Sequence, residues 1–181
     1  MSRVHEAGAM VSTNESGEVT VVTETGVGRD VDKEVVELIY RSCISLDNQD
    51  FAQWLDLCAQ EFRYAITTYS PEIRKEMIWL EHDREGMEGL FKMLPKHNSD
   101  HSPLTRHASV YVVEYDEAGK EASVVTSLVV YKTQLDGGAT ELFAVGKYFD
   151  TISLEGDVPL LTSRNVRLDT RELGIGSHMP F

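Results

Sequence analysis

The sequence has 181 residues, of which 41% are hydrophobic and 26% charged, as is typical of a single globular domain. Its formal net charge of −13 argues against binding to nucleic acid or to an anionic membrane surface, since both require clustered cations. No stretch approaches the roughly 18 consecutive apolar residues of a membrane span, and the first residues lack an apolar signal core, so we expect a cytoplasmic protein.

Residues 1–29 are rich in Gly, Ser, Thr and Glu and show no sustained hydrophobic period. Such a segment cannot bury enough apolar surface to order itself, so we predict a flexible N-terminal arm. Within the arm, residues 19–22 (VTVV) have the composition of a strand, which could pair with a partner. The folded part is expected to be one domain that spans residues 30–181.

Three helices are predicted at the start of this domain. The first begins near Asp30 and ends before Asp50, which is expected to cap the second helix with Gln53 three residues later. The third begins after Asp83 and is expected to stop at Pro95. Residues at helical spacing are predicted to face the core: Val31, Val35, Ile39, Cys43 and Leu46 in the first helix, Phe51, Trp54, Leu55 and Cys58 in the second, and Met87, Leu90, Phe91 and Leu94 in the third.

Strands are predicted between the second and third helices and throughout the second half. The first two, at 62–69 and 72–80, are joined at Ser70-Pro71. From His107 onward the hydrophobic period changes from about 3.6 to 2, which indicates strands. Four are predicted, at 107–117, 121–134, 140–155 and 159–170. The turns between them, at 117–120, 136–138 and 155–157, each contain glycine, which adopts a positive φ easily.

The strand predicted at 121–134 is apolar on both faces. One face carries Ala122, Val124, Leu128 and Val130, and the other carries Val125, Val129 and Tyr131. Such a sheet is covered on both sides, by helices on one and by a partner or a closed cavity on the other. Gly146, in the middle of the next strand, predicts a bulge or sharp bend. These elements indicate an α+β fold, in which N-terminal helices pack on a strongly curved, mainly antiparallel sheet.

Several segments resemble the β (small) subunits of Rieske-type aromatic-ring-hydroxylating dioxygenases. They are residues 46–66, 82–94, 102–107 and the stretch from Val124 to the end. Within them, TRH at 105–107, LFAVGKYFD at 142–150, NVRLD at 165–169 and MPF at 179–181 stand in the places of the family's motifs. Ser102-Pro103-Leu104 and Lys147-Tyr148 depart from the family pattern, which suggests an outlying branch acting on a small non-aromatic substrate.

This resemblance implies a nuclear-transport-factor-2-like cone and a non-catalytic, structural role in an oxygen- and NADH-dependent monooxygenase or dioxygenase. Three copies would join three large catalytic (α) subunits in a heterohexamer, served by a ferredoxin and an NADH-dependent reductase. The large subunit would carry the Rieske two-iron two-sulfur cluster and a mononuclear non-haem iron. The resemblance leaves two candidate substrates, methanesulfonate and an aromatic compound. Expected contacts to partner subunits are Arg106, His107, Arg164 and Arg167, with Phe181 as a C-terminal anchor.

The sequence itself predicts no catalytic, metal-binding or cofactor-binding residue. A Rieske cluster requires paired C-x-H and C-x-x-H motifs, and neither Cys43 nor Cys58 is followed by histidine at that spacing. Both cysteines are interpreted as small core residues. The densest set of metal-ligand types is His97, Asp100 and His101, which we interpret as part of a solvated loop because an unsupported loop rarely holds ligands rigidly.

Two alternatives from other functional classes remain open at this point. In the first, the cone is a free-standing isomerase or dehydratase that uses His107 with Asp83 or a tyrosine as general acid and base. In the second, it is a small-ligand-binding module without chemistry. The tyrosines of the predicted strands are more simply amphipathic sheet residues whose hydroxyls reach the rim, namely Tyr111, Tyr115, Tyr131 and Tyr148.

Overall fold

The computed structural model describes residues 5–6, 9–13, 19–23, 30–97, 100–172 and 180–181. The main domain contains three helices and a six-stranded sheet with the order β5-β4-β9-β8-β7-β6. The helices are α1 (Asp30–Asp47), α2 (Phe51–Asp56) and α3 (Arg84–His97). The strands are β4 (Cys58–Ser70), β5 (Lys75–Asp83), β6 (Leu104–Tyr115), β7 (Glu121–Thr133), β8 (Thr140–Ser153) and β9 (Leu160–Leu168).

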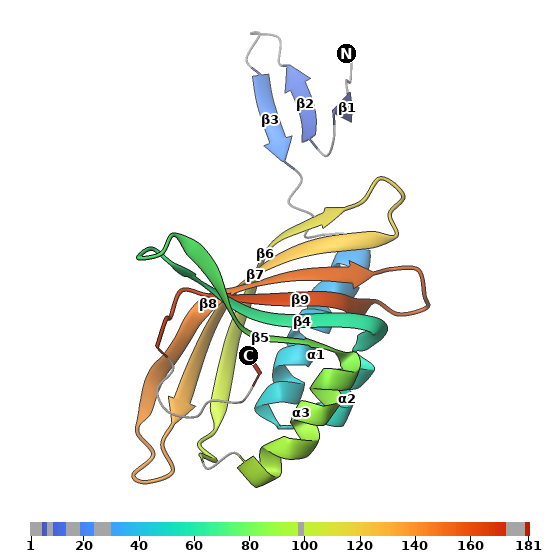
Figure 1. Ribbon diagram of the computed structural model, residues 1–181. Helices are drawn as coiled ribbons and strands as arrows, with labels where there is room; N and C mark the ends of the chain where they lie inside the picture. Colours follow the sequence, from blue (N-terminus) through green and yellow to red (C-terminus); the bar gives the residue numbers. More distant parts are fainter. Residues whose placement is uncertain (1–4, 7–8, 14–18, 24–29, 98–99, 173–179) are drawn as a thin grey trace.

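All neighbouring strands of this sheet are antiparallel except β4 and β9, which run parallel. The sheet is strongly bent, and the three helices lie on one side of it (Figure 1). The long strands β6, β7, β8 and β9 follow one another as a meander, as the change of hydrophobic period predicts. The predicted α+β architecture is therefore confirmed.

Helix α1 packs on the sheet through the apolar stripe that its sequence predicts. The stripe residues whose side chains are described are all buried: Val35, Ile39, Cys43 and Leu46. The helix ends where Gln49 takes a left-handed φ of 55°. Asp50 then caps α2, because its Oδ1 accepts a 3.0 Å hydrogen bond from the backbone N–H of Gln53. The predicted capping interaction is confirmed.

Helix α3 begins as predicted but ends later. Asp83 Oδ1 accepts a 2.9 Å hydrogen bond from the backbone N–H of Gly86, which satisfies a donor of the first turn. The helix then runs past Pro95 to His97. Pro95 lacks the backbone N–H that would donate to the carbonyl four residues earlier, but the helix continues for two residues beyond it. The predicted stop at Pro95 is therefore wrong by two residues.

Two strand boundaries also differ from the prediction. Cys58 opens β4 instead of closing the second helix, because the carbonyl of Leu57 accepts a 2.9 Å hydrogen bond from the N–H of Leu161 and joins the chain to β9. Strand β5 begins at Lys75, since Arg74 has a φ of 53° and belongs to the turn. The first difference arises from pairing between distant segments, which local periodicity does not contain, and the second arises from the turn between β4 and β5.

Gly146 lies at a close approach between β8 and β9 and not at a bulge. A Cβ added there would lie 2.4 Å from the carbonyl oxygen of Arg167. The irregularity in β8 is at Phe143, where its register against β7 shifts by one residue. The predicted bulge therefore exists in this strand but is displaced toward its start. Among the turn glycines, a positive φ occurs at Gly119, Gly137 and Gly138 but not at Gly156.

We expect Gly146→Ala to lower the free energy of unfolding by about 1–3 kcal/mol, because the new methyl group forces β8 and β9 apart. Gly89→Ala is the matched control. Its Cβ would meet nothing within 4 Å, and alanine has the higher helix propensity in α3. Urea unfolding of both variants measures the difference, and equal stability would contradict the close approach.

The N-terminal arm contains regular structure in its described parts. Strands β1 (His5–Glu6), β2 (Ala9–Thr13) and β3 (Val19–Thr23) form a separate antiparallel sheet. The predicted strand at 19–22 is thus confirmed, but it pairs with β2 of the same arm. The prediction of a flexible arm also covers the remaining arm residues, and these lie outside the described part of the chain.

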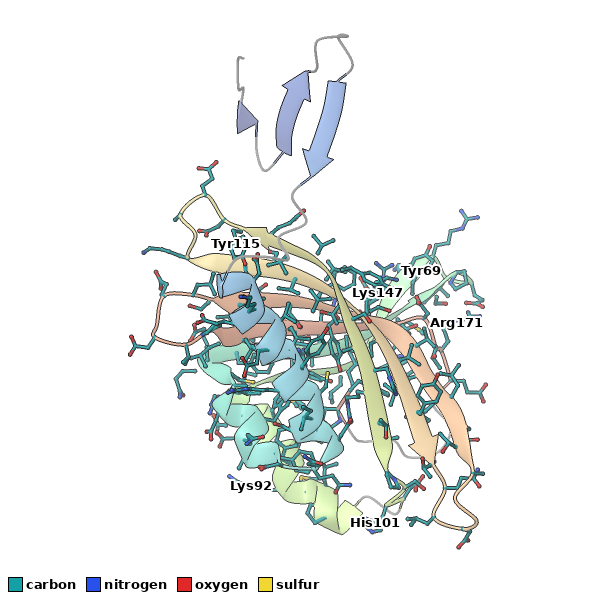
Figure 2. All side chains as sticks on the ribbon, turned by 180° about the vertical axis from the view of Figure 1, so that it is seen from behind. Tyr69, Lys92, His101, Tyr115, Lys147 and Arg171 are labelled. Carbon is teal, nitrogen blue, oxygen red and sulfur yellow. The ribbon has the colours of Figure 1, made fainter. Side chains whose placement is uncertain are left out.

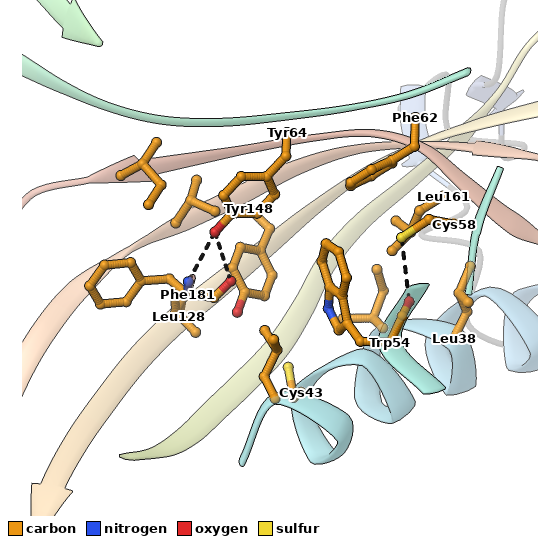
Figure 3. Close-up of a cluster of buried hydrophobic side chains, with 14 of the residues drawn as sticks. Leu38, Cys43, Trp54, Cys58, Phe62, Tyr64, Leu128, Tyr148, Leu161 and Phe181 are labelled. Atoms are coloured by element: carbon orange, nitrogen blue, oxygen red, sulfur yellow. Dashed lines mark hydrogen bonds between the residues drawn. The ribbon is translucent and has the colours of Figure 1, made fainter. Parts of the chain in front are cut away.

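The core fills the space between the helices and the sheet. Trp54 is completely buried and makes edge-to-face contacts with the rings of Phe62, Tyr64 and Phe91 at centroid distances of 5.5, 6.0 and 5.6 Å. Figure 3 shows that this aromatic cluster continues to Tyr148 and Phe181 on the inner side of the sheet. Within the described residues, no helix is long and apolar enough to cross a membrane.

Candidate functional site: the interior and outer face of the sheet

Arg164 of β9 lies at the centre of the interior, with a completely buried side chain. Its Nε and Nη2 each donate a 2.8 Å hydrogen bond to the carboxylate of Asp150 on β8. Its Nη1 donates to Ser42 Oγ of α1 at 2.9 Å, and its guanidinium lies 4.0 Å from the ring centroid of Tyr148. Burial alone would lower the pKa of Arg164, but the Asp150 carboxylate raises that pKa above its ordinary value. Burial also raises the pKa of the Asp150 carboxyl, but its two hydrogen bonds from Arg164 favour the carboxylate. Through Ser42 the pair ties α1 to the sheet.

A second buried arginine joins the end of α1 to the end of the sequence. Arg106 of β6 pairs with Asp47 at 2.5 Å, and its Nη2 donates a 2.7 Å hydrogen bond to the carbonyl of Pro180. Tyr64 of β4 binds the next residue twice, because its hydroxyl accepts from the N–H of Phe181 at 2.9 Å and donates to the carbonyl at 3.2 Å. Figure 3 shows both bonds.

These positions change the roles predicted for three residues. Arg106, Arg164 and Phe181 were predicted to contact partner subunits, but all three are buried within their own chain, and Phe181 is only 1% exposed. Their partners were missed by sequence reasoning. The sequence did contain one indication of this burial. Asp150 lies two residues from both Tyr148 and Ile152 on β8, so its side chain points to the same inner face as theirs.

The outer face is the side of the sheet away from α1, and it carries the other two predicted contacts. The strand registers place its side chains in rows across β6, β7 and β8. One row is Val112, Val125 and Phe149, a second is His107, Val129 and Val145, and a third is Thr105, Tyr131 and Leu142. A polar row between the first two contains Ser109, Ser127 and Lys147 and continues to Arg167 on β9. The two predicted faces of β7 are confirmed.

His107 is exposed on this outer face, where its ring meets that of Tyr131 edge-on at 5.5 Å. It lies on the edge strand β6, whereas Asp83 ends β5 at the opposite edge of the sheet. The pair of His107 with Asp83 proposed for an isomerase is therefore not assembled, and the tyrosine beside His107 is Tyr131. Tyr148, predicted to reach the rim, is instead completely buried, because it stacks on Arg164.

A groove of about 570 Å³ lies at one end of the outer face. Its cationic side chains are Lys147, Arg167 and Arg171, and aromatic side chains of Tyr69 and Phe149 also line it. In Figure 2 the labelled Tyr69, Lys147 and Arg171 lie on the same side of the molecule. Arg171 pairs with Glu72 at 2.6 Å, and Arg167 lies 3.9 Å from Glu76.

The cysteines do not fit an iron–sulfur cluster. Burial raises the pKa of the Cys58 thiol to about 12 and that of the Cys43 thiol above its ordinary value, whereas a ligand must be a thiolate. Asp100 is paired with Lys132, and the side chain of His97 lies outside the described residues. In the part of the chain that the structure describes, no three His, Cys, Asp or Glu side chains are grouped to hold a metal ion.

Comparison with known proteins places the chain among oxygenase subunits. The family described as ring hydroxylating beta subunit matches residues 41–174. The chain is 45% identical over 160 residues to methanesulfonate monooxygenase hydroxylase subunit beta of Methylosulfonomonas methylovora. The aligned region covers 84% of this chain and 88% of the relative. The chain is 32% identical over 147 residues to 2-aminobenzenesulfonate 2,3-dioxygenase subunit beta of an Alcaligenes species, covering 81% and 97%.

A solved structure gives the same fold. A protein from Novosphingobium aromaticivorans, described as the beta subunit of an aromatic-ring-hydroxylating dioxygenase, superposes with a TM-score of 0.73 at 21% identity, covering 83% of this chain and 97% of that one. This likeness confirms the nuclear-transport-factor-2-like cone. The family match and the two sequence relatives confirm the resemblance seen in the motifs. The chain belongs to the ring-hydroxylating beta-subunit family and is a β subunit of an oxygenase of that class.

Proposed function

We propose that this chain is a non-catalytic structural subunit that holds large catalytic subunits in register, in a hexamer of three large and three small subunits. The observation that carries the proposal is the contrast between the two sides of the sheet. The inner side is filled by helices, buried ion pairs and Phe181, whereas the outer side presents rows of partly exposed apolar side chains with a polar row between them.

The outer face has the character of a protein interface. Leu142 is 59% exposed, Tyr111 56% and Phe149 38%. Phe149 lies in the row of Val112, which follows Tyr111 on β6, and Leu142 lies in the row of Tyr131. Large groups of exposed apolar side chains are uncommon on monomers and often mark interaction sites. Aromatic residues such as Tyr111, Tyr131 and Phe149 are also enriched at interface centres. We assign this face to contacts with partner subunits.

The charges beside this surface support a protein partner. Lys147 and Arg167 are directly opposite each other in the β8–β9 ladder, and like charges in such positions repel. Glu76, 3.9 Å from Arg167, offsets part of this repulsion, and an acidic side chain of the large subunit placed in the groove would offset more of it. His107 and Arg167 thus keep the interface role that the sequence predicts for them, whereas Arg106, Arg164 and Phe181 support the fold from within.

The catalytic groups are assigned to the partner. The Rieske cluster and the mononuclear iron would lie on the large subunit, and a ferredoxin and an NADH-dependent reductase would deliver electrons to the cytoplasmic complex. The relative with 45% identity is a subunit of a methanesulfonate monooxygenase, so we propose methanesulfonate or a related small sulfonate as the substrate. The 2-aminobenzenesulfonate relative keeps an aromatic sulfonate as the second candidate.

The first test is the iron content and the role of His107. The chain purified alone is expected to retain well under one iron per chain after dialysis against a chelator, because its cysteines are buried and protonated. In the assembled complex, His107→Ala is expected to leave turnover per iron near normal. Tight stoichiometric iron in the isolated chain, or lost turnover in an assembled and iron-replete His107→Ala complex, would contradict the non-catalytic role.

A further inference from the structure

Pro180 and Phe181, here called the terminal pair, are held in the interior as a ligand is held in a pocket. Three strands contribute to the site: Tyr64 from β4, Arg106 from β6 and Phe143 from β8. The ring of Phe181 stacks on that of Phe143 at a centroid distance of 6.0 Å and an interplanar angle of 20°. In Figure 1 the end of the chain lies within the bend of the sheet.

Among the described residues, the bonds to the terminal pair come from side chains. Tyr64 contacts both the N–H and the carbonyl of Phe181 through one hydroxyl, and Arg106 donates to the carbonyl of Pro180. Arg106 is itself fixed by Asp47, which also accepts from its backbone N–H at 3.1 Å. A set of pre-positioned donors and acceptors around an aromatic slot is the usual form of a small-molecule site.

The site also contains a buried hydrogen-bonding group that does not bind the terminal pair. Arg106 Nε is buried and has no hydrogen-bond partner among the described residues. Native structures leave few such groups unsatisfied, so each one requires an explanation. Arg106 Nε belongs to the guanidinium whose Nη2 binds the carbonyl of Pro180, so this unused donor lies beside the terminal pair.

We propose that the interior of the sheet is a binding site for a small aromatic group that carries an adjacent amide or carbonyl, and that the terminal pair occupies this site as a built-in ligand. The pair closes the interior to other small molecules. This assignment concerns the inner side of the sheet and is independent of assembly with a large subunit.

The direct test removes the built-in ligand and supplies it again from solution. A chain that ends at residue 179 is expected to melt on the order of 10 °C lower than the full chain, since it loses a buried aromatic ring. Acetyl-prolyl-phenylalaninamide should raise the melting temperature of this shortened chain in a saturable way. Acetyl-prolyl-alaninamide should not, and neither peptide should affect the full chain, whose site is filled.

Tyr64→Phe in the shortened chain separates recognition from simple cavity filling. It keeps the ring but removes the hydroxyl that binds Phe181 twice, so the phenylalanine peptide should bind about tenfold more weakly. Phe149→Ala, an outer-face change, is the control and should leave peptide binding unaltered. Equal peptide affinity with and without the Tyr64 hydroxyl would overturn the proposed recognition.

A second variant decides the question if the shortened chain does not fold. Phe181→Ala in the full chain leaves the main-chain bonds in place and opens a ring-sized space against Phe143. Apolar cavities of that size bind benzene, so titration calorimetry should detect benzene binding to Phe181→Ala and none to the natural chain. A folded Phe181→Ala chain that binds no benzene would overturn the proposal, as would a shortened chain that folds with unchanged stability and ignores the peptide.

Discussion

Replacing Arg164 with leucine is expected to lower the free energy of unfolding by about 3–5 kcal/mol. The substitution leaves the Asp150 carboxylate buried without its two 2.8 Å hydrogen bonds. It also removes the bond to Ser42, which joins α1 to the sheet, and the contact with the ring of Tyr148. An unpaired buried charge is among the most destabilising changes a core can undergo.

Urea unfolding of the isolated chain measures this effect, with Arg167→Leu as the matched control. Arg167 lies on the same strand but is exposed, so its replacement should change stability by no more than about 0.5 kcal/mol. The double variant Arg164→Leu with Asp150→Leu should recover most of the loss, because replacing both members of a buried pair leaves no orphaned charge. Equal costs for Arg164→Leu and Arg167→Leu would show that the buried pair is not what joins α1 to the sheet.

The second large effect is expected on assembly. Phe149→Lys and Leu142→Lys each place a charge within the apolar outer face, where a partner subunit would have to desolvate it. Each variant should weaken association with the large subunit by about 2 kcal/mol or more, roughly 30-fold, while the chain itself stays folded.

Ile44→Lys is the control for this experiment. Ile44 is 56% exposed on α1, on the other side of the sheet, and its replacement should leave association unchanged. Co-purification with a tagged large subunit, read against the melting temperature of each variant, distinguishes a lost interface from a lost fold. Normal association of both outer-face variants would assign the interface elsewhere.

The sequence predicted those features that depend on local periodicity. The stripe of α1, the cap at Asp50 and the alternation along β7 all follow from spacing within one element, and all are confirmed. The two apolar faces of β7 also led to the expectation that a partner covers the outer side of the sheet, which stays a prediction.

The arginine roles could not be predicted in the same way. Arg106 binds Asp47, which is 59 residues away in the sequence, and Arg164 binds Ser42, which is 122 residues away. The burial of both arginines therefore depends on contacts that only the tertiary fold creates. A charged residue in a strand reads as a surface group unless an opposite charge is known to face it. The resemblance of TRH and NVRLD to family motifs located important residues, but it did not indicate whether they act inside the chain or at its surface.

The mass of the native complex tests the structural role most directly. The chain is co-expressed with its large subunit, and the purified species is weighed by native mass spectrometry together with its iron content. We predict one species with equal numbers of large and small subunits, three of each, and with the iron accounted for by the large subunits. A large subunit that is complete and active alone, with this chain recovered separately, would contradict the account.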